Sequence, residues 1–232
     1  MSRMAKHAFY GMALCGALAA PAAQAATAAQ PTVVELFTSQ GCSSCPPAND
    51  NLRALADRPD VLALSFGVTY WDYLGWKDTF AQPAFTARQR DYEGPLGHAA
   101  SFTPQVVVDG HLDTVGNVRG DIERLIAQSH RAPGPAITFG NGKIAVGASA
   151  PQETAQVWLV RYDPRIIQVP VARGENSGVT LPHKNVVRSL SLLGEWKGQA
   201  ASFALPPAPA GLKTAVLVQD GRGGAIIAAA RD

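Results

Sequence analysis

Cys42 and Cys45, two cysteines separated by two residues, are the part of this sequence best suited to chemistry. Pro46 and Pro47 follow directly, and since proline is tolerated only in the first turn of a helix, a helix is expected to begin within residues 42–46. Unpaired backbone N–H groups at such a helix start stabilise a thiolate on the first cysteine. A C-x-x-C pair also closes a small disulfide ring. The pattern therefore indicates thiol–disulfide redox chemistry.

Residues 1–25 are typical of a secretory signal peptide. Arg3 and Lys6 supply a positive start, residues 8–20 form a short apolar run, and Ala-Gln-Ala at 23–25 is a cleavage site. The apolar run is too short for a permanent anchor, and no later stretch approaches the ~20 apolar residues of a membrane-spanning helix. We therefore expect no stable membrane span and a periplasmic or secreted location.

Removal of the signal would leave Cys42 and Cys45 as the only cysteines. Because this exported chain has no wider disulfide framework, the simpler interpretation is that its one cysteine pair has a functional and not a structural role. Of 20 basic and 18 acidic residues, the signal holds two basic ones and no acidic one, so that the mature chain is formally neutral. A neutral chain without basic blocks argues against nucleic acid or an anionic membrane as its main partner.

A strand is expected over residues 32–37 (TVVELF), because β-branched and aromatic residues dominate this run. Glu35 is out of place within it. One interpretation puts Glu35 on the exposed face of an edge strand. The other makes it a buried carboxylate near the sulfurs that shuttles a proton for Cys45. The sequence favours neither.

The rest of the first half alternates between strands and helices. Asp109-Gly110 between two apolar runs is a strong hairpin signal. After the C-x-x-C we expect a helix through 51–56, a strand at 61–66, an aromatic loop at 71–80, a helix at 82–92, strands at 105–108 and 112–115, and a helix at 119–129.

This order, with C-x-x-C opening the first helix, resembles the thioredoxin fold. The resemblance implies a cis-proline just before the third strand, and Thr103-Pro104 occupies that place; the alternative is that Pro104 only begins a strand. It also implies that Cys42, nearer the solvent, is the attacking thiolate, that Cys45 resolves the mixed disulfide, and that Pro104 positions the substrate backbone. Glu35 falls close to the buried acid of thioredoxins, with one residue of extra spacing before Cys42.

Five further residues are candidates for a substrate groove. Ser43 and Ser44 lie between the cysteines, where their hydroxyls would stabilise a thiolate without adding charge. Thr103, Trp71 and Trp76 are the others. The aromatic residues of the 71–80 loop either cover the groove beside the sulfurs, fill a core between domains, or present an exposed binding surface.

Four longer motifs support a narrower resemblance. They are ELFTSQGCSSCPPAN, YWDYLGWKDTFAQPAFTARQRDY, TPQVVVDG and, in the second half, RGEN-x-G-x-x-L-x-H-x-NVVR. Together they resemble a family of secreted bacterial thioredoxin-like proteins that is catalogued as a domain of unknown function. The resemblance runs from about Val33 to the C-terminus and implies a fold and a compartment but no reaction. Relatives carry His and Asp where this chain has Gly67 and Thr69, so a proton relay or metal ligand there would be lost.

The second half begins after Ala-Pro-Gly-Pro at 132–135, which is typical of a linker. The residues that follow lack helical periodicity and predict eight short strands. We therefore expect an α/β thioredoxin-like domain followed by an antiparallel β-sandwich-like domain. The expected division is a signal peptide at 1–25, the thioredoxin-like domain at 31–131 and the β-rich C-terminal domain at 136–232.

Arg173, Glu175, Asn176 and His183 lie in one expected loop of the second half. They either form a polar site that steers a partner toward the C-x-x-C, or hold the loop through their own hydrogen bonds. The histidines of the mature chain show no metal-ligand spacing, and two thiolates fall short of the four ligands of a structural zinc site. We expect no bound metal and no cofactor.

These observations favour an exported thiol–disulfide oxidoreductase, an enzyme whose partners are protein thiols or disulfides and a redox partner still to be identified. Two alternatives from other classes remain. One is a structural or partner-binding module with an inert disulfide. The other is a Cu(I)-binding metallochaperone, because two thiolates suit Cu(I), although no Met-rich stretch or paired His accompanies them.

Overall fold

The computed structural model describes Met1 and residues 30–232, so that the expected signal peptide, apart from Met1, lies outside the described residues. In the first half the elements follow in the expected order: β1 (Thr32–Thr38), α1 (Pro46–Leu55), β2 (Val61–Gly67), the 3-10 helix η1 (Asp72–Leu74), α2 (Pro83–Asp91), β3 (Gln105–Val108), β4 (Leu112–Thr114) and α3 (Arg119–Gln128). The second half contributes β5 (Ile137–Gly140), β6 (Lys143–Val146), β7 (Ala155–Asp163), β8 (Ile167–Pro170), β9 (Thr180–His183), β10 (Val186–Trp196), β11 (Ala201–Ala204), β12 (Lys213–Asp220) and β13 (Ile226–Arg231).

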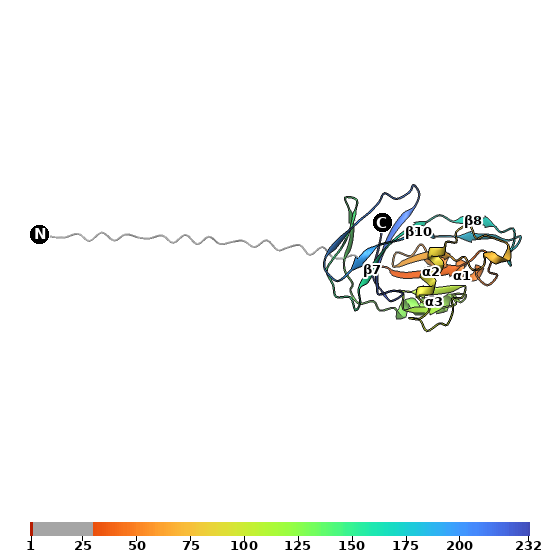
Figure 1. Ribbon diagram of the computed structural model, residues 1–232, viewed down its shortest axis with the longest axis horizontal. Coiled ribbons are helices and arrows are strands. Elements are labelled where there is room, and N and C mark those ends of the chain that lie inside the picture. The colour runs from red at the N-terminus through yellow and green to blue at the C-terminus, as the bar shows by residue number, and fades with distance from the viewer. Residues whose placement is uncertain (2–29) are drawn as a thin grey trace.

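Eight of these strands form one mixed sheet that runs through both halves of the chain, in the order β13-β12-β7-β10-β2-β1-β3-β4 (Figure 1). β1 pairs with β2 in parallel and with β3 antiparallel, whereas β12 pairs antiparallel with both β7 and β13. Residues 30–232 are thus mostly β, with three short α-helices. The expected α/β thioredoxin-like domain followed by an antiparallel β-sandwich-like domain is therefore wrong. The division at 31–131 and 136–232 stays a prediction.

The two halves join where β10 adds to the edge of β2. Val186 pairs with Ser65, and the Ser65 N–H donates to the Asn185 carbonyl at 3.0 Å. The Asn185 side-chain amide also donates to the Ala63 carbonyl at 2.8 Å. All of β2 is buried, as expected of a strand that is covered on both faces. The apolar sequence of β2 indicates this burial but does not reveal which strand pairs with the edge of β2. Because that partner could not be identified, the sequence suggested two separate sheets.

Helices cover both faces of the β1–β2–β3 part of the sheet. Val34 and Leu36 point to the face on which α1 and α3 pack, and Val33 and Phe37 point to the face covered by α2, because successive side chains of a strand alternate. These two cores fix the position of α1, whose N-terminus follows the cysteines. Among residues 30–232 no helix has the length and apolar character that crossing a membrane requires.

Two smaller sheets complete the second half. The sheet β11-β6-β5 packs on β7 and β12 through a core that contains Trp196, and β8 pairs with β9 beside α1. The sequence predicted a loop in place of β9. Pro182 lies inside this strand, and proline is confined to edge strands, so the strand signal was weak.

Glu35 belongs to a buried hydrogen-bond network. β1 is interior to the sheet and Glu35 has no exposed surface, so the interpretation of an exposed edge strand is wrong. Arg88 donates to both carboxylate oxygens of Glu35, at 2.6 and 3.0 Å, and the Tyr92 hydroxyl donates at 2.5 Å. Burial holds the pKa of Tyr92 well above its usual value, which keeps this donor protonated. Arg88 also donates to Gln219 of β12 at 3.2 Å, so the network connects the two halves.

We expect Glu35→Ala to lower the free energy of unfolding by about 3–5 kcal/mol, because it leaves the buried Arg88 charged and without its partner. Chemical denaturation followed by circular dichroism measures this change. Asp121→Ala is the matched control, since it removes an exposed ion pair with Arg124 and should cost less than about 1 kcal/mol. Equal costs for the two substitutions would contradict a structural role for the buried pair.

Candidate functional site

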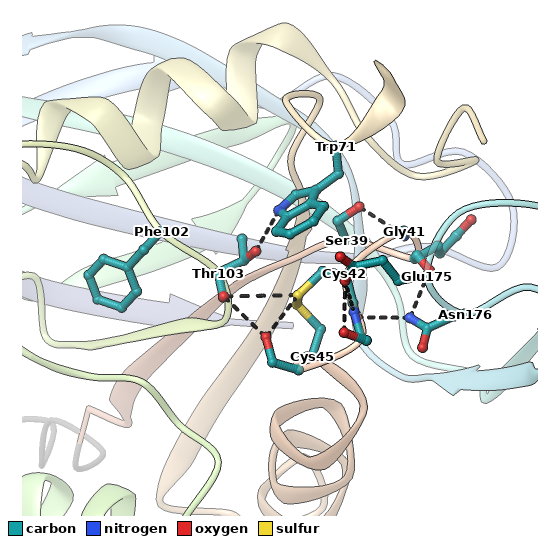
Figure 2. Close-up of a disulfide and its surroundings, with 12 residues drawn as sticks. Ser39, Gly41, Cys42, Cys45, Trp71, Phe102, Thr103, Glu175 and Asn176 are labelled. Atoms are coloured by element: carbon teal, nitrogen blue, oxygen red, sulfur yellow. Dashed lines mark hydrogen bonds between the residues drawn. A yellow bond between two sulfur atoms is a disulfide. The ribbon is translucent and has the colours of Figure 1, made fainter. Parts of the chain in front are cut away.

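A disulfide between Cys42 and Cys45 lies at the start of α1 (Figure 2). The two Cα atoms are 5.5 Å apart, and Cys45 is the residue that caps the helix, with Pro46 in its first turn. Ser43 and Ser44 between them are exposed. Neither cysteine has any exposed surface, so the expectation that Cys42 lies nearer the solvent is wrong for this disulfide-bonded state.

Thr103 lies on one side of the disulfide (Figure 2). The Cys42 sulfur is 3.9 Å from the Thr103 carbonyl oxygen and 3.2 Å from the Ser44 hydroxyl. The Trp71 indole N–H donates to the Thr103 hydroxyl at 2.7 Å. The Thr103-Pro104 peptide is cis, as expected. The structure thus brings Cys42, Ser44, Trp71 and Thr103 together, and their role in a substrate groove stays a prediction.

Residues 173–176, which we call the clasp, lie on the other side of the disulfide. Glu175 Oε2 accepts two hydrogen bonds from Ser43, from the backbone N–H at 2.9 Å and from the hydroxyl at 2.7 Å. The Asn176 amide donates to the carbonyls of Gln40 at 3.0 Å and Cys42 at 2.8 Å. A segment of the second half therefore holds the C-x-x-C loop through its backbone. The two Ser43 bonds lower the pKa of Glu175, which keeps its carboxylate ionised.

The clasp approaches the C-x-x-C loop closely at Gly174. Its φ of +80° lies in the left-handed region, and a Cβ atom there would be 3.4 Å from the Gly41 Cα atom. Glycine adopts this conformation without steric cost and leaves room for the neighbouring backbone. In the RGEN sequence, Gly174 therefore makes a close backbone contact, and the side chains of Glu175 and Asn176 bind the loop that carries the cysteines. Its first residue, Arg173, makes no hydrogen bond or ion pair among residues 30–232.

Trp76 does not line the disulfide. Its indole N–H donates to the Gln40 side-chain carbonyl at 2.9 Å, and its ring packs with Val169 and Leu181 of the β8–β9 sheet. The Gln40 backbone N–H donates to Asp78 at 2.6 Å, and burial raises the pKa of this carboxyl group. Gln40 and Asp78 fix the aromatic loop beneath the site. Sequence reasoning missed both, because a polar residue in a loop gives no sign of its burial.

The remaining predicted positions lie away from the sulfurs. The carboxylate oxygens of Glu35 bind Arg88 and Tyr92, and no contact with either sulfur is present, so its role as a proton shuttle stays a prediction without support. At Gly67 a Cβ atom would lie 2.8 Å from the Ala81 nitrogen, so no larger side chain fits there. Thr69 binds the Thr86 hydroxyl through its N–H and its own hydroxyl, both at 3.0 Å.

His183, at the end of β9, is buried, with 2% of its surface exposed. It packs edge-on against Phe80, with ring centroids 5.3 Å apart, and its Nε2 atom has no hydrogen-bond partner in the described part of the chain. Burial, with a smaller contribution from Arg53, lowers the pKa of His183 to about 4. It is therefore a neutral packing residue at pH 7. Across residues 30–232, no group of three or more His, Cys, Asp or Glu side chains could hold a metal ion.

The family described as "Protein of unknown function (DUF1223)" matches residues 33–219. Protein AGR_C_4864 from Agrobacterium tumefaciens is a similar solved structure, with 30% sequence identity and a TM-score of 0.70 over 89% of this chain and 95% of that one. HBP35 of Porphyromonas gingivalis, at 13% identity and a TM-score of 0.55 over 88% of this chain and 74% of that one, is similar in fold alone. No curated protein matches the chain.

We expect His183 to make the protein less stable in mild acid. Its pKa of about 4 in the folded state lies below the ordinary 6.5, so the unfolded chain binds the proton more readily and stability falls as the pH drops from about 6.5 toward 4. The full loss would be about 3 kcal/mol. Denaturation of the natural protein and of His183→Leu between pH 7 and pH 4.5 measures it.

The readout is the difference in slope between the two proteins. His183→Leu should lose less stability on acidification, whereas His130→Gln, at an exposed position, should follow the natural protein. Identical pH dependence in the natural protein and in His183→Leu would show that His183 is not buried as a neutral side chain.

Proposed function

The chain belongs to the DUF1223 family of proteins of unknown function, and we propose that it is a thiol–disulfide oxidoreductase working through Cys42 and Cys45. One observation carries this proposal. The two cysteines form a disulfide at the N-terminus of a helix, with a backbone carbonyl, that of Thr103, 3.9 Å from the Cys42 sulfur. The N-terminus of a helix stabilises a cysteine thiolate relative to the thiol, and the thiolate is the species that attacks a disulfide.

The proposed reaction has two exchange steps. In the reduced protein the Cys42 thiolate attacks a substrate disulfide, so that a mixed disulfide forms and one substrate thiolate leaves. Cys45 then attacks the Cys42 sulfur, the second substrate thiolate leaves, and the protein disulfide forms. Two electrons pass to the substrate, whose leaving thiolates take up the protons. The same steps in reverse oxidise a substrate dithiol.

Substrate would approach from the side of Ser44 and Thr103. Ser44 is exposed, and Trp71 fixes the Thr103 side chain beside the sulfur. Tyr73 stacks on Trp71 with 78% of its surface exposed, which extends this side with an aromatic surface. Pro104 keeps its proposed role of positioning a substrate backbone. The partners under this proposal are protein thiols or disulfides, in the periplasm or outside the cell.

A relationship to the thioredoxin-like superfamily is part of the same proposal. Its support is local: the C-x-x-C at the start of α1 and the Thr103-Pro104 segment beside it. The eight-stranded sheet as a whole does not supply that support.

A partner-binding module with an inert disulfide is the second candidate, and a specific observation favours it. Cys42 and Cys45 are both fully buried, and the clasp holds the loop that carries them. A buried disulfide exchanges slowly because a thiolate cannot reach it. Exposed Tyr73 would then belong to a binding surface. The Cu(I)-binding alternative has only the cysteine pair to support it.

Replacement of the resolving cysteine tests the first candidate against the second. We expect Cys45→Ser to accumulate mixed disulfides with other proteins, because Cys42 still attacks substrate disulfides but nothing resolves the adduct. The exported protein is captured after acid quenching and thiol alkylation, and its adducts are separated on non-reducing gels and released by reductant.

Cys42→Ser is the matched control and should trap far fewer proteins, because it keeps one thiol but lacks the attacking one. Equal trapping by both variants would contradict the assigned order of the two cysteines. A Cys45→Ser protein that traps nothing, while a known oxidoreductase variant traps its substrates in the same cells, would favour the inert disulfide.

A further inference from the structure

We propose that Glu175 is a positioning residue that shifts the redox equilibrium of the Cys42–Cys45 pair toward the disulfide. This inference rests on the proposed function and gives the second half of the chain a part in it. Glu175 lies 130 or more residues after the cysteines in the chain, yet it binds the dipeptide between them, through Ser43 at a sequence separation of 132. No motif of the first half indicates this contact.

The first observation is the position of the charge. Glu175 Oε2 accepts hydrogen bonds from both the backbone N–H and the hydroxyl of Ser43, at 2.9 and 2.7 Å. Ser43 directly follows Cys42 in the sequence, so the carboxylate is bound to the residue next to the attacking cysteine. Among residues 30–232 Glu175 takes part in no ion pair. Its negative charge is therefore not cancelled by a local cation.

The second observation is that hydrogen bonds of the clasp backbone and of Asn176 fix the Glu175 carboxylate beside the cysteines. The next residue, Asn176, is buried and donates to two main-chain carbonyls of the C-x-x-C loop, those of Gln40 and Cys42. The Glu175 N–H donates to the Gly41 carbonyl at 3.3 Å. These bonds fix the backbone on both sides of the Glu175 side chain. The charge thus keeps its place beside the cysteines with little additional loss of conformational freedom.

The consequence follows from the charges of the two redox states. The disulfide is neutral, whereas reduction produces a dithiol whose Cys42 forms a thiolate. A Cys42 thiolate near this fixed carboxylate is disfavoured by like-charge repulsion. The carboxylate therefore costs the reduced state free energy and leaves the disulfide almost unaffected. The pair becomes more reducing, which suits donation of electrons to a substrate disulfide.

Equilibration with glutathione at pH 7 measures this effect. The protein disulfide and two glutathione thiols give the protein dithiol and one glutathione disulfide, so one S–S bond breaks, one forms, and two electrons and two protons pass to the protein. Because Glu175 is exposed and its charge is partly screened by solvent, we expect E175Q to shift this equilibrium toward the dithiol by about two- to fivefold, a rise of roughly 10–20 mV in the potential. Gln keeps the size and an acceptor oxygen but removes the charge.

Two further variants and a second measurement separate the charge of Glu175 from other effects. Glu175→Asp retains the carboxylate and should stay closer to the natural protein than E175Q. Glu195→Gln removes an exposed carboxylate on β10 and should leave the equilibrium unchanged. In the reduced proteins, the rate of Cys42 alkylation should also reach half its maximum at a lower pH for E175Q, which a purely structural role of Glu175 would not produce.

The outcomes distinguish this inference from the proposed function. If natural protein and E175Q both equilibrate with glutathione and share one equilibrium constant and one alkylation profile, the role of Glu175 is overturned while the oxidoreductase stands. If neither protein exchanges with glutathione, the oxidoreductase proposal is overturned, and the role of Glu175 with it.

Discussion

The pairing of β10 with β2 is the interaction on which the rest of the structure depends. Val186 pairs with Ser65, and the backbone and side chain of Asn185 add two hydrogen bonds to β2. These contacts join the two halves into one eight-stranded sheet. The same junction places the β8–β9 sheet next to α1. From there the clasp reaches the C-x-x-C loop. Without this pairing β2 would expose an apolar edge, and Glu175 and Asn176 would have no fixed position relative to the cysteines.

The site consequently consists of two layers with different physical roles. Thr103, Trp71 and Ser44 surround the sulfur with groups of the first half, arranged by short-range turns and the start of α1. The clasp adds, from the second half, a charge and three donated hydrogen bonds to main-chain carbonyls. The buried Glu35–Arg88 pair lies on the α2 face of the sheet and connects to Gln219 of β12. It stabilises the union of the halves at a distance from the chemistry.

The sequence predicted what depends on local signals. The cysteine pair at a helix start, the Thr103-Pro104 segment and the order of the first seven elements follow from spacing, proline and apolar periodicity. It failed where long-range pairing decides: the apolar run of β2 does not name its partner strand, and Pro182 concealed β9. Burial of Glu35 was foreseen as one alternative, but its partners were not, although Arg88 of α2 and Tyr92, the residue that follows this helix, lie four residues apart and are hydrogen-bonded to each other. Glu175 was singled out without its contact, because nothing local links it to Ser43.

The proposed function requires that the Cys42–Cys45 disulfide exchanges with other thiols, although both sulfurs are buried. A redox titration of the pair against glutathione, with alkylation to count free thiols, tests this most directly. We expect a measurable equilibrium, with a potential of roughly −180 to −270 mV, between those of oxidising and reducing exchange proteins. A potential below about −300 mV with slow exchange is the behaviour of an inert structural disulfide and would contradict it.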